Sequence, residues 1–228
     1  MVIAIGDLAY LDGSMERFAN CYQTRWGRHR NRTYPSPGNH EYVTAGATPY
    51  YTYFGSAAGE FGRGYYSYDL GGWHIISLNS NVPDSPASPQ GQWLRDDLSA
   101  STKKCQLAYW HFPTFSSSTS DGGFMKDAWR ILQDFGTEIV LVAHDHGYER
   151  FAPQSADGRR DETRGIQQFV VGTGGAPLYL FRGRKPNSEV QISEYGVIKL
   201  ALHNNSFDSA FVTINDAIKD PQLGIPCH

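Results

Sequence analysis

Several short apolar segments of this sequence run directly into aspartate, asparagine or histidine, where an ordinary loop would begin with turn residues alone. Such short, bounded apolar segments predict strands, and we expect them at residues 2–5, 65–69, 73–78, 106–110, 139–143, 168–171, 197–202 and 207–214. Helical patterns lie between them at residues 15–24, 89–98 and 126–135. Strands that alternate with helices favour an α/β layered fold. The last strands are expected to be antiparallel and to extend the sheet.

Length and net charge limit the number of domains and the classes of partner that this chain can have. The chain has 228 residues, which suits one well-buried domain and is too short for two large ones. We therefore expect a single domain over residues 1–228 with one site. The formal net charge of −3 gives no general basic field, which argues against nucleic acid as the main partner. No run of about 18 apolar residues occurs, so no transmembrane helix and no membrane partner are expected.

The sequence by itself does not decide the cellular compartment of the protein. Residues 1–5 are too short and too uncharged to be a signal peptide. The three cysteines, Cys21, Cys105 and Cys227, leave at least one without an intramolecular partner, and none lies in a C-x-x-C pair. Cysteine usage therefore does not decide between an oxidising and a reducing compartment.

Two polar stretches near the N-terminus are candidates for metal chemistry. Gly6 and Asp7 directly follow residues 2–5, so that the glycine lets the backbone turn and the aspartate emerges at the strand end. Taken alone, Asp7 is better explained as a turn residue that bonds its own backbone. Residues 38–41 read Gly-Asn-His-Glu after two prolines that stiffen the approach. The amide oxygen of Asn39 suits a hard cation, and His40 beside it would point elsewhere, free to meet a substrate oxygen. A capped polar loop is the alternative here.

Two later apolar segments end in histidine. Residues 106–110 run into His111, and residues 139–143 run into His144 and His146. A His-x-His at a strand end can direct two imidazoles toward two adjacent ions, and ligands of open α/β sheets bind at the carboxyl ends of strands. A single buried histidine is more often a core residue, so the argument depends on the combination. The remaining histidines that we expect to be structural are His29, His74, His203 and His228.

Taken together and in this order, the residues resemble the pattern of the calcineurin-like metallophosphoesterases over essentially the whole chain; they are Asp7, Asn39, His111, His144 and His146. Tyr10, three residues after Asp7, narrows the resemblance to the purple acid phosphatases, in which a tyrosine phenolate binds a ferric ion. Residues 38–41 and 144–150 also fit that branch.

The resemblance implies a layered sandwich of mixed β-sheets flanked by helices, with a dinuclear metal centre of Fe(III) and a divalent ion. It assigns Asp7 as the bridging carboxylate, Tyr10 and His146 to the ferric side, and Asn39, His111 and His144 to the divalent side. Phenolate and carboxylate oxygens suit ferric iron, and imidazole suits divalent zinc, iron or manganese. Two ions about 3.5 to 4 Å apart would hold a phosphate and generate hydroxide.

The function implied by the resemblance is hydrolysis of phosphate monoesters, with a small phosphorylated substrate as the partner. His40 is the candidate to bind the phosphate or to protonate the leaving group. A phosphodiesterase on the same scaffold is the nearest alternative, because the sequence does not show how open the cleft is. A non-catalytic metal-binding remnant is the second alternative. The resemblance also implies a secreted or extracytoplasmic protein.

The expected pattern is incomplete at one point. The family's first motif, a strand that ends in a ferric-binding aspartate, is expected upstream of Asp7, but only six residues precede Asp7. Asp12 lies in the same loop and cannot replace a residue delivered by a separate strand. We therefore expect the chain to lack this strand and first metal motif, to be a poor phosphatase by itself, and to expose the edge of a neighbouring strand.

Three further residues or segments are expected to support the site. Glu149 and Arg150 follow the His-x-His sequence and are expected to orient its loop. Residues 172–175 read Gly-Thr-Gly-Gly, which resembles a phosphate-binding loop only loosely because no Lys-Ser/Thr follows. We expect a tight turn near the metal site there.

Overall fold

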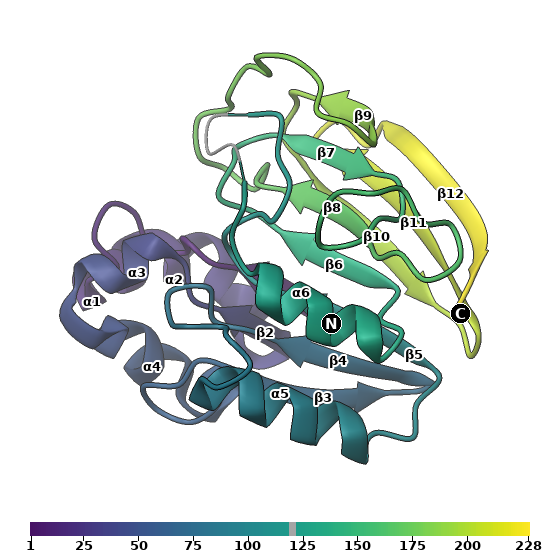
Figure 1. The fold of residues 1–228 in the computed structure, drawn as a ribbon. Coiled ribbons are helices and arrows are strands. Elements are labelled where there is room, and N and C mark those ends of the chain that lie inside the picture. The colour runs from purple at the N-terminus through teal and green to yellow at the C-terminus, as the bar shows by residue number, and fades with distance from the viewer. Residues whose placement is uncertain (119–121) are drawn as a thin grey trace.

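A mixed seven-stranded sheet forms the centre of the structure, a computed structural model that describes residues 1–118 and 122–228 (Figure 1). Its strands follow the order β3 (Tyr66–Leu70), β4 (Trp73–Ser77), β5 (Cys105–Tyr109), β6 (Ile139–Val142), β8 (Gln167–Val171), β7 (Tyr148–Phe151) and β9 (Ser188–Ile192). The central strands β4, β5, β6 and β8 are parallel. The outer pairs are antiparallel. The parallel strands place their carboxyl ends along one edge, where β5 and β6 run into the histidines.

A second sheet packs on one face of the first. It contains β10 (Gly196–Leu202), β11 (Ser206–Thr213) and β12 (Ile218–Pro226), all antiparallel. Alternate residues of β11 are buried, and Phe207 and Phe211 share one core with Trp73 of the large sheet. The expected antiparallel pairing is therefore confirmed, but the expectation that these strands extend the sheet was wrong. A strand with one apolar face has to be covered on that face, and here the two sheets cover each other.

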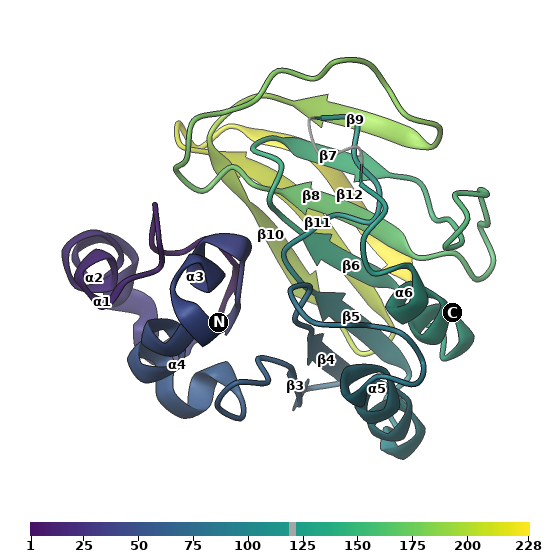
Figure 2. The same ribbon diagram turned by 60° about the vertical axis from the view of Figure 1, so that its left-hand side comes forward.

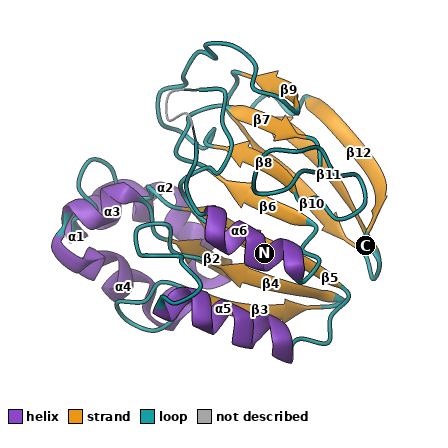
Figure 3. Cartoon of the chain, in the orientation of Figure 1, coloured by secondary structure: helices purple, strands orange, loops and turns teal. Residues whose placement is uncertain are grey.

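Helices cover the opposite face of the large sheet (Figures 2 and 3). They are α5 (Pro89–Ala100) and α6 (Lys126–Asp134), whose buried side chains join the core beneath the sheet. Ser88 caps α5 by accepting the backbone N–H of Gly91 at 3.1 Å, as its place before Pro89 predicts. The layered α/β architecture is thus confirmed, with the order helices, large sheet, small sheet.

The N-terminal part forms a third region, built on the two-stranded parallel sheet of β1 (Val2–Ile5) and β2 (Thr33–Ser36). Helical segments precede and follow β2: α1 (Met15–Arg17), η1 (Phe18–Tyr22), α2 (Gln23–Arg25), η2 (Trp26–Arg32), α3 (Asn39–Val43), η3 (Ala45–Ala47), α4 (Thr48–Phe54) and η4 (Gly55–Ala58). Aromatic side chains form their common core, with Phe18 stacked on Tyr53 at a centroid distance of 4.9 Å. This region carries the loops that bear Asp7 and Asn39.

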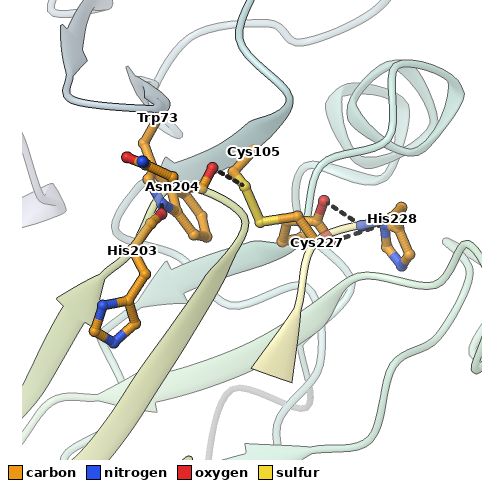
Figure 4. Close-up of a disulfide and its surroundings, with 7 residues drawn as sticks. Trp73, Cys105, His203, Asn204, Cys227 and His228 are labelled. Carbon is orange, nitrogen blue, oxygen red and sulfur yellow. Dashed lines mark hydrogen bonds and ion pairs between the residues drawn. A yellow bond between two sulfur atoms is a disulfide. The ribbon is translucent and has the colours of Figure 1, made fainter. Parts of the chain in front are cut away.

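A disulfide joins the C-terminus to the large sheet and resolves the open cysteine pairing (Figure 4). Cys105 at the start of β5 is bonded to Cys227, with their Cα atoms 5.6 Å apart and a sequence separation of 122. Cys21 is free and exposed. Next to the disulfide, the backbone N–H of His228 donates to Glu138 at 2.9 Å. The end of the small sheet is therefore tied covalently to the large one.

None of the helices in residues 1–118 and 122–228 is long and apolar enough to cross a membrane.

The disulfide predicts a stability difference. Replacing Cys227 by serine removes a crosslink between positions with a sequence separation of 122, and we expect the free energy of unfolding to fall by about 2–4 kcal/mol because the unfolded chain gains freedom. Denaturant unfolding of the oxidised wild type and Cys227→Ser measures the difference. Cys21→Ser is the matched control and should change stability by less than about 0.5 kcal/mol. A wild type whose stability is the same with and without reductant would contradict the pairing.

Candidate metal centre

The sequence-predicted ligands come together at the carboxyl ends of four parallel strands. Asp7 and Tyr10 lie in the loop after β1, and Asn39 is the first residue of α3 after β2. His111 follows β5, and the His144 and His146 pair follows β6. Residues that follow strands of the two-stranded and the seven-stranded sheet therefore meet at one place, although they are spread over more than half of the sequence.

Four of these side chains form a first cluster. The Asn39 Oδ1 atom lies 3.1 Å from His111 Nε2 and 3.0 Å from His144 Nδ1. The two imidazole nitrogens are 3.2 Å apart, and Asp7 Oδ2 is 3.1 Å from His111 Nε2. Three of the ligand atoms, on Asp7, His111 and His144, have the spacing of a metal site.

The hydrogen bonds of His111 show that this cluster fits a cation. Its Nδ1 lies 2.9 Å from the carbonyl oxygen of Ile5, which only accepts, so Nδ1 carries a proton. In the neutral ring, Nε2 then presents a lone pair to the oxygens of Asn39 and Asp7 and to a nitrogen of His144. Electron pairs that point at one another in this way repel unless a cation lies among them. The donor set of imidazole, amide and carboxylate suits a divalent transition metal.

The pKa values in the cluster follow from burial and from Asp7. Burial lowers the pKa of His144 to about 4, and the neighbouring His111 adds to this shift, which favours the neutral imidazole that metal coordination requires. Burial also disfavours a charged His111, but the hydrogen bond and charge of Asp7 outweigh it and raise the pKa of His111. Burial would raise the pKa of Asp7 as well, but the His111 contacts outweigh it and lower that pKa.

A second cluster shares the same carboxylate oxygen. The Tyr10 hydroxyl lies 3.3 Å from Asp7 Oδ2 and 3.1 Å from His146 Nε2. The Nδ1 atom of His146 donates to the carbonyl oxygen of Pro177 at 2.8 Å, which leaves Nε2 to face Tyr10. Burial and then the charge of Asp7 raise the pKa of Tyr10. A phenolate at this position therefore needs a strong cation beside it, and a hard trivalent ion is the kind that phenolate and carboxylate oxygens prefer.

His40 lies beside both clusters and belongs to neither. Its Nδ1 is hydrogen bonded to the carbonyl oxygen of Leu11, and its Nε2 is 3.9 Å from Asp7 Oδ2. The side chain is 28% exposed, and its ring centroid lies 4.5 Å from that of Tyr10. The side chain of His40 thus lies next to the carboxylate that both clusters share and is partly exposed to solvent.

The buried carboxylate of Glu41 supports the site, and the sequence analysis gave it no role. It accepts the backbone N–H groups of Asp7 at 2.8 Å, Leu8 at 2.8 Å, Ala9 at 3.2 Å and Gly38 at 2.8 Å. These bonds tie the loop after β1 to the start of α3. The signal in the sequence is a charged residue three positions after Gly38 in a short stretch that also holds a ligand, which is the spacing of a capping box.

The backbone at the ligands is unusual. Asp7 and His144 both adopt the left-handed region, with φ of 53° and 59°, which is uncommon for residues with a side chain and is often found at functional sites. Gly38 allows the two N-terminal loops to meet, because a Cβ atom there would lie 2.2 Å from Asp7 Oδ1. The two loops are therefore in close contact at Asp7, the residue that both clusters share.

Two of the expected supporting residues act elsewhere. The guanidinium of Arg150 pairs with Asp220 of β12 at 2.7 Å, and the carboxylate of Glu149 accepts the N–H of Ser117 at 2.8 Å. The expectation that they orient the His-x-His loop was wrong, because as neighbours in strand β7 they point to opposite faces and away from the strand end. The turn at residues 172–175 does lie beside that loop, since Gly172 N–H donates to Gly147 O at 3.2 Å.

The four remaining histidines have structural partners, as expected. His74 lies between Asp69 at 2.9 Å and Asp97 at 2.8 Å. His203 pairs with Asp208 and His228 with Glu138. His29 is hydrogen bonded to its neighbouring arginines.

The chain is similar to known phosphatases. A sequence profile of the family described as calcineurin-like phosphoesterase matches residues 1–148. Purple acid phosphatase 15 of Arabidopsis thaliana is 29% identical over 66% of this chain and 35% of its own length. Acid phosphatase type 7 of Homo sapiens is 27% identical over 75% of this chain and 47% of its own length. The chain thus spans about a third to a half of the length of these relatives.

The fold also matches a solved structure. Purple acid phosphatase PPD1 from yellow lupin (Lupinus luteus) seeds superposes with a TM-score of 0.80 over 96% of this chain and 45% of that protein, at 20% sequence identity. At this identity the superposition establishes the shared fold. It agrees with the layered arrangement of sheets and helices described above.

The role of Glu41 can be tested by Glu41→Gln. The amide has one acceptor oxygen and places its NH2 group against backbone donors, so at least one buried N–H loses its partner. We expect the free energy of unfolding to fall by about 2–3 kcal/mol, and zinc affinity to fall about 10- to 100-fold. Denaturant unfolding and chelator competition measure these effects. Glu60→Gln, an exposed glutamate paired with Arg63, is the control. A Glu41→Gln protein with unchanged stability and zinc affinity would show that the four hydrogen bonds do not hold the site.

Proposed function

Because the chain belongs to the calcineurin-like phosphoesterase family, we propose that its metal centre hydrolyses phosphate monoesters at two ions, as a purple acid phosphatase would. The observation that carries the proposal is the position of Asp7 Oδ2, which lies 3.1 Å from a nitrogen of the first cluster and 3.3 Å from the hydroxyl of the second. One carboxylate oxygen thus faces two donor sets at once, which is what a bridging ligand requires.

The two donor sets differ in chemistry, and this supports two different ions. Asn39, His111 and His144 would hold a divalent zinc, iron or manganese ion, while Tyr10 and His146 would hold Fe(III). When bound, such a pair of ions binds and polarises the phosphate and supplies a water molecule of lowered pKa. The carbonyl oxygens of Ile5 and Pro177 fix the ring orientations of His111 and His146, so that the coordinating nitrogens need not reorganise.

His40 is assigned to the substrate. Its Nδ1 is bound to the backbone at Leu11, which leaves Nε2 directed over the shared carboxylate and partly exposed to solvent. In that position it binds a phosphate oxygen or gives a proton to the departing oxygen of the ester. The backbone N–H of His40 also donates to Asp7 Oδ1 at 2.9 Å, so the substrate group and the bridging ligand are positioned by the same residue.

The disulfide supports an extracytoplasmic location. A bond between Cys105 and Cys227 forms and persists in oxidising compartments and is rare in the cytosol. The proposed location agrees with the expectation from the resemblance. Recovery of the oxidised pair from the native source, trapped with a thiol-blocking reagent, tests it. If Cys105 and Cys227 both react with the reagent as free thiols, the result would count against this location.

Tyr10 tests the ferric assignment. Iron-loaded wild type should show a visible absorption band from phenolate-to-iron charge transfer, and Tyr10→Phe should lose it, because phenylalanine has no oxygen to coordinate. Iron content, measured alongside by elemental analysis, separates loss of the band from loss of the metal. A band that persists in Tyr10→Phe with iron bound would assign the colour to another residue. Tyr179→Phe, whose ring stacks on His146, is the matched control for loss of a hydroxyl.

His40 tests whether the centre is catalytic. His40→Ala should keep both ions, since His40 lies outside both donor clusters, and kcat/KM for a monoester should fall about 100-fold or more. The measurements are metal content and turnover of a monoester and of a diester, and the exposed His29→Ala is the control. Loss of an ion in His40→Ala would make His40 a ligand. A wild type that binds both ions but hydrolyses neither ester would overturn the proposed activity.

A further inference from the structure

A column of aromatic rings rises from the metal centre into solvent. The ring of Phe112 lies against that of His144, with centroids 4.5 Å apart, and Phe124 stacks on Phe112 at 4.6 Å with an angle of 18° between the rings. His144 contributes a ligand atom to the first cluster. Phe124 at the outer end is 41% exposed. The column therefore starts at a candidate ligand and presents an apolar ring beside the place where a substrate would enter.

The backbone around Phe124 holds this ring in place. The N–H of Gly123 donates to Thr114 O at 2.7 Å and closes the loop beneath the ring. Gly122 has φ of 69°, and a Cβ atom there would lie 2.6 Å from the same carbonyl oxygen. Met125, directly after Phe124, is also left-handed, with φ of 57°, and its side chain is buried. The left-handed conformation of Met125 costs free energy, and the exposed ring of Phe124 does little for the core, so the free energy spent on presenting this ring is a sign of function.

A second apolar wall lies at the other cluster. The ring of Tyr179 is stacked on His146, with centroids 4.2 Å and planes 21° apart, and its N–H donates to His146 O at 2.8 Å. Leu180, the next residue, is 81% exposed. The ion-binding atoms are therefore flanked by rings on the His144 side and on the His146 side. Such surfaces favour a flat apolar group, and they offer little to a small group that is rich in hydroxyls.

We propose that Phe124 binds the leaving group of the substrate and that the preferred substrates are phosphate monoesters of flat aromatic groups. This inference rests on the proposed function. With the phosphate at the metal centre, the aromatic part of the ester lies along the column and stacks on Phe124. Phe124 is thus a specificity-determining residue, and its contacts with the leaving group distinguish aryl from alkyl esters.

The test compares two monoesters, phenyl phosphate and glycerol phosphate, on metal-loaded wild type, Phe124→Ala and Phe124→Tyr. For each protein we take the ratio of the two kcat/KM values and compare this ratio between variants. Intrinsic leaving-group reactivity is the same for every variant, so most of its effect drops out of the comparison. We expect Phe124→Ala to lower the phenyl-to-glycerol ratio about tenfold, and Phe124→Tyr to retain it because the tyrosine ring still stacks. Phe61→Ala is the matched control, since Phe61 is 62% exposed and contacts Tyr51 in α4.

Binding provides a readout that needs no turnover. Phenylphosphonate and methylphosphonate carry the same acidic group and differ in the ring, and calorimetry on the same proteins gives the ratio of their Kd values. We expect wild type to favour the phenyl compound and Phe124→Ala to lose most of that preference. Equal ratios in wild type and Phe124→Ala, in both turnover and binding, would overturn the inference. If the wild type turns over neither ester, the proposed function fails, and the phosphonate ratio still decides whether Phe124 binds an aromatic group.

Discussion

The hydrogen bonds of the Glu41 carboxylate are the constraint on which the site depends. Glu41 is fully buried, and its two oxygens accept four backbone N–H groups from two loops that are more than 30 residues apart in sequence. Burial, followed by the charge of Asp7, raises the pKa of Glu41, so this arrangement carries an electrostatic cost. The N–H donors offset that cost because only the ionised carboxylate can accept all of them. The hydrogen bonds from the backbone of the loop after β1 to Glu41 therefore fix the position of Asp7. The Asp7 side chain takes no part in them and can face the two donor sets.

A similar principle orients two of the imidazoles. The Nδ1–H group of His111 donates a hydrogen bond to the carbonyl oxygen of Ile5 in β1. The Nδ1–H group of His146 donates to the carbonyl oxygen of Pro177, which follows β8 in the chain. In both cases a backbone carbonyl selects the tautomer and turns Nε2 toward the ligand cluster. His144 is different, because it uses Nδ1 in the cluster and has left-handed backbone. That difference explains how His144 and His146, only two residues apart, reach separate clusters on the two sides of Asp7.

The sequence predicts those parts of the fold that rest on strong local patterns. The apolar strands that end in His111 and His144 and the helix capped by Ser88 are where they were expected. Strand β2 was missed because Pro35 removes a backbone donor from a four-residue strand, which makes it look like a loop. Strand β12 was missed because it is mostly exposed and polar and is held by pairing with β11. Such strands are determined by their neighbours in space, which local patterns do not contain.

The same distinction applies to the site. Residue types and order were sufficient to name seven side chains, six of which converge on two clusters and one of which, His40, lies beside them. The role of Glu41 could not be predicted from residue types and order. Its four hydrogen-bond partners are backbone N–H groups, which every residue except proline has, so the sequence does not identify them. The Cys105–Cys227 pairing and the Phe112–Phe124 stack were likewise out of reach, since each joins segments whose proximity follows only from the folded chain.

Charge links the two clusters through Asp7. Burial opposes the charged form of both His111 and Tyr10, and Asp7 raises the pKa of each of them. In the proposed two-ion centre, each ion would compete with protons for its ligand, because only a deprotonated imidazole nitrogen or phenolate coordinates a metal. Each of these ions also draws on the charge of the same carboxylate oxygen, so occupation of one cluster changes the field that the other ion meets. Binding of one of the proposed ions would therefore depend on binding of the other, with Asp7 Oδ2 as the atom that couples them.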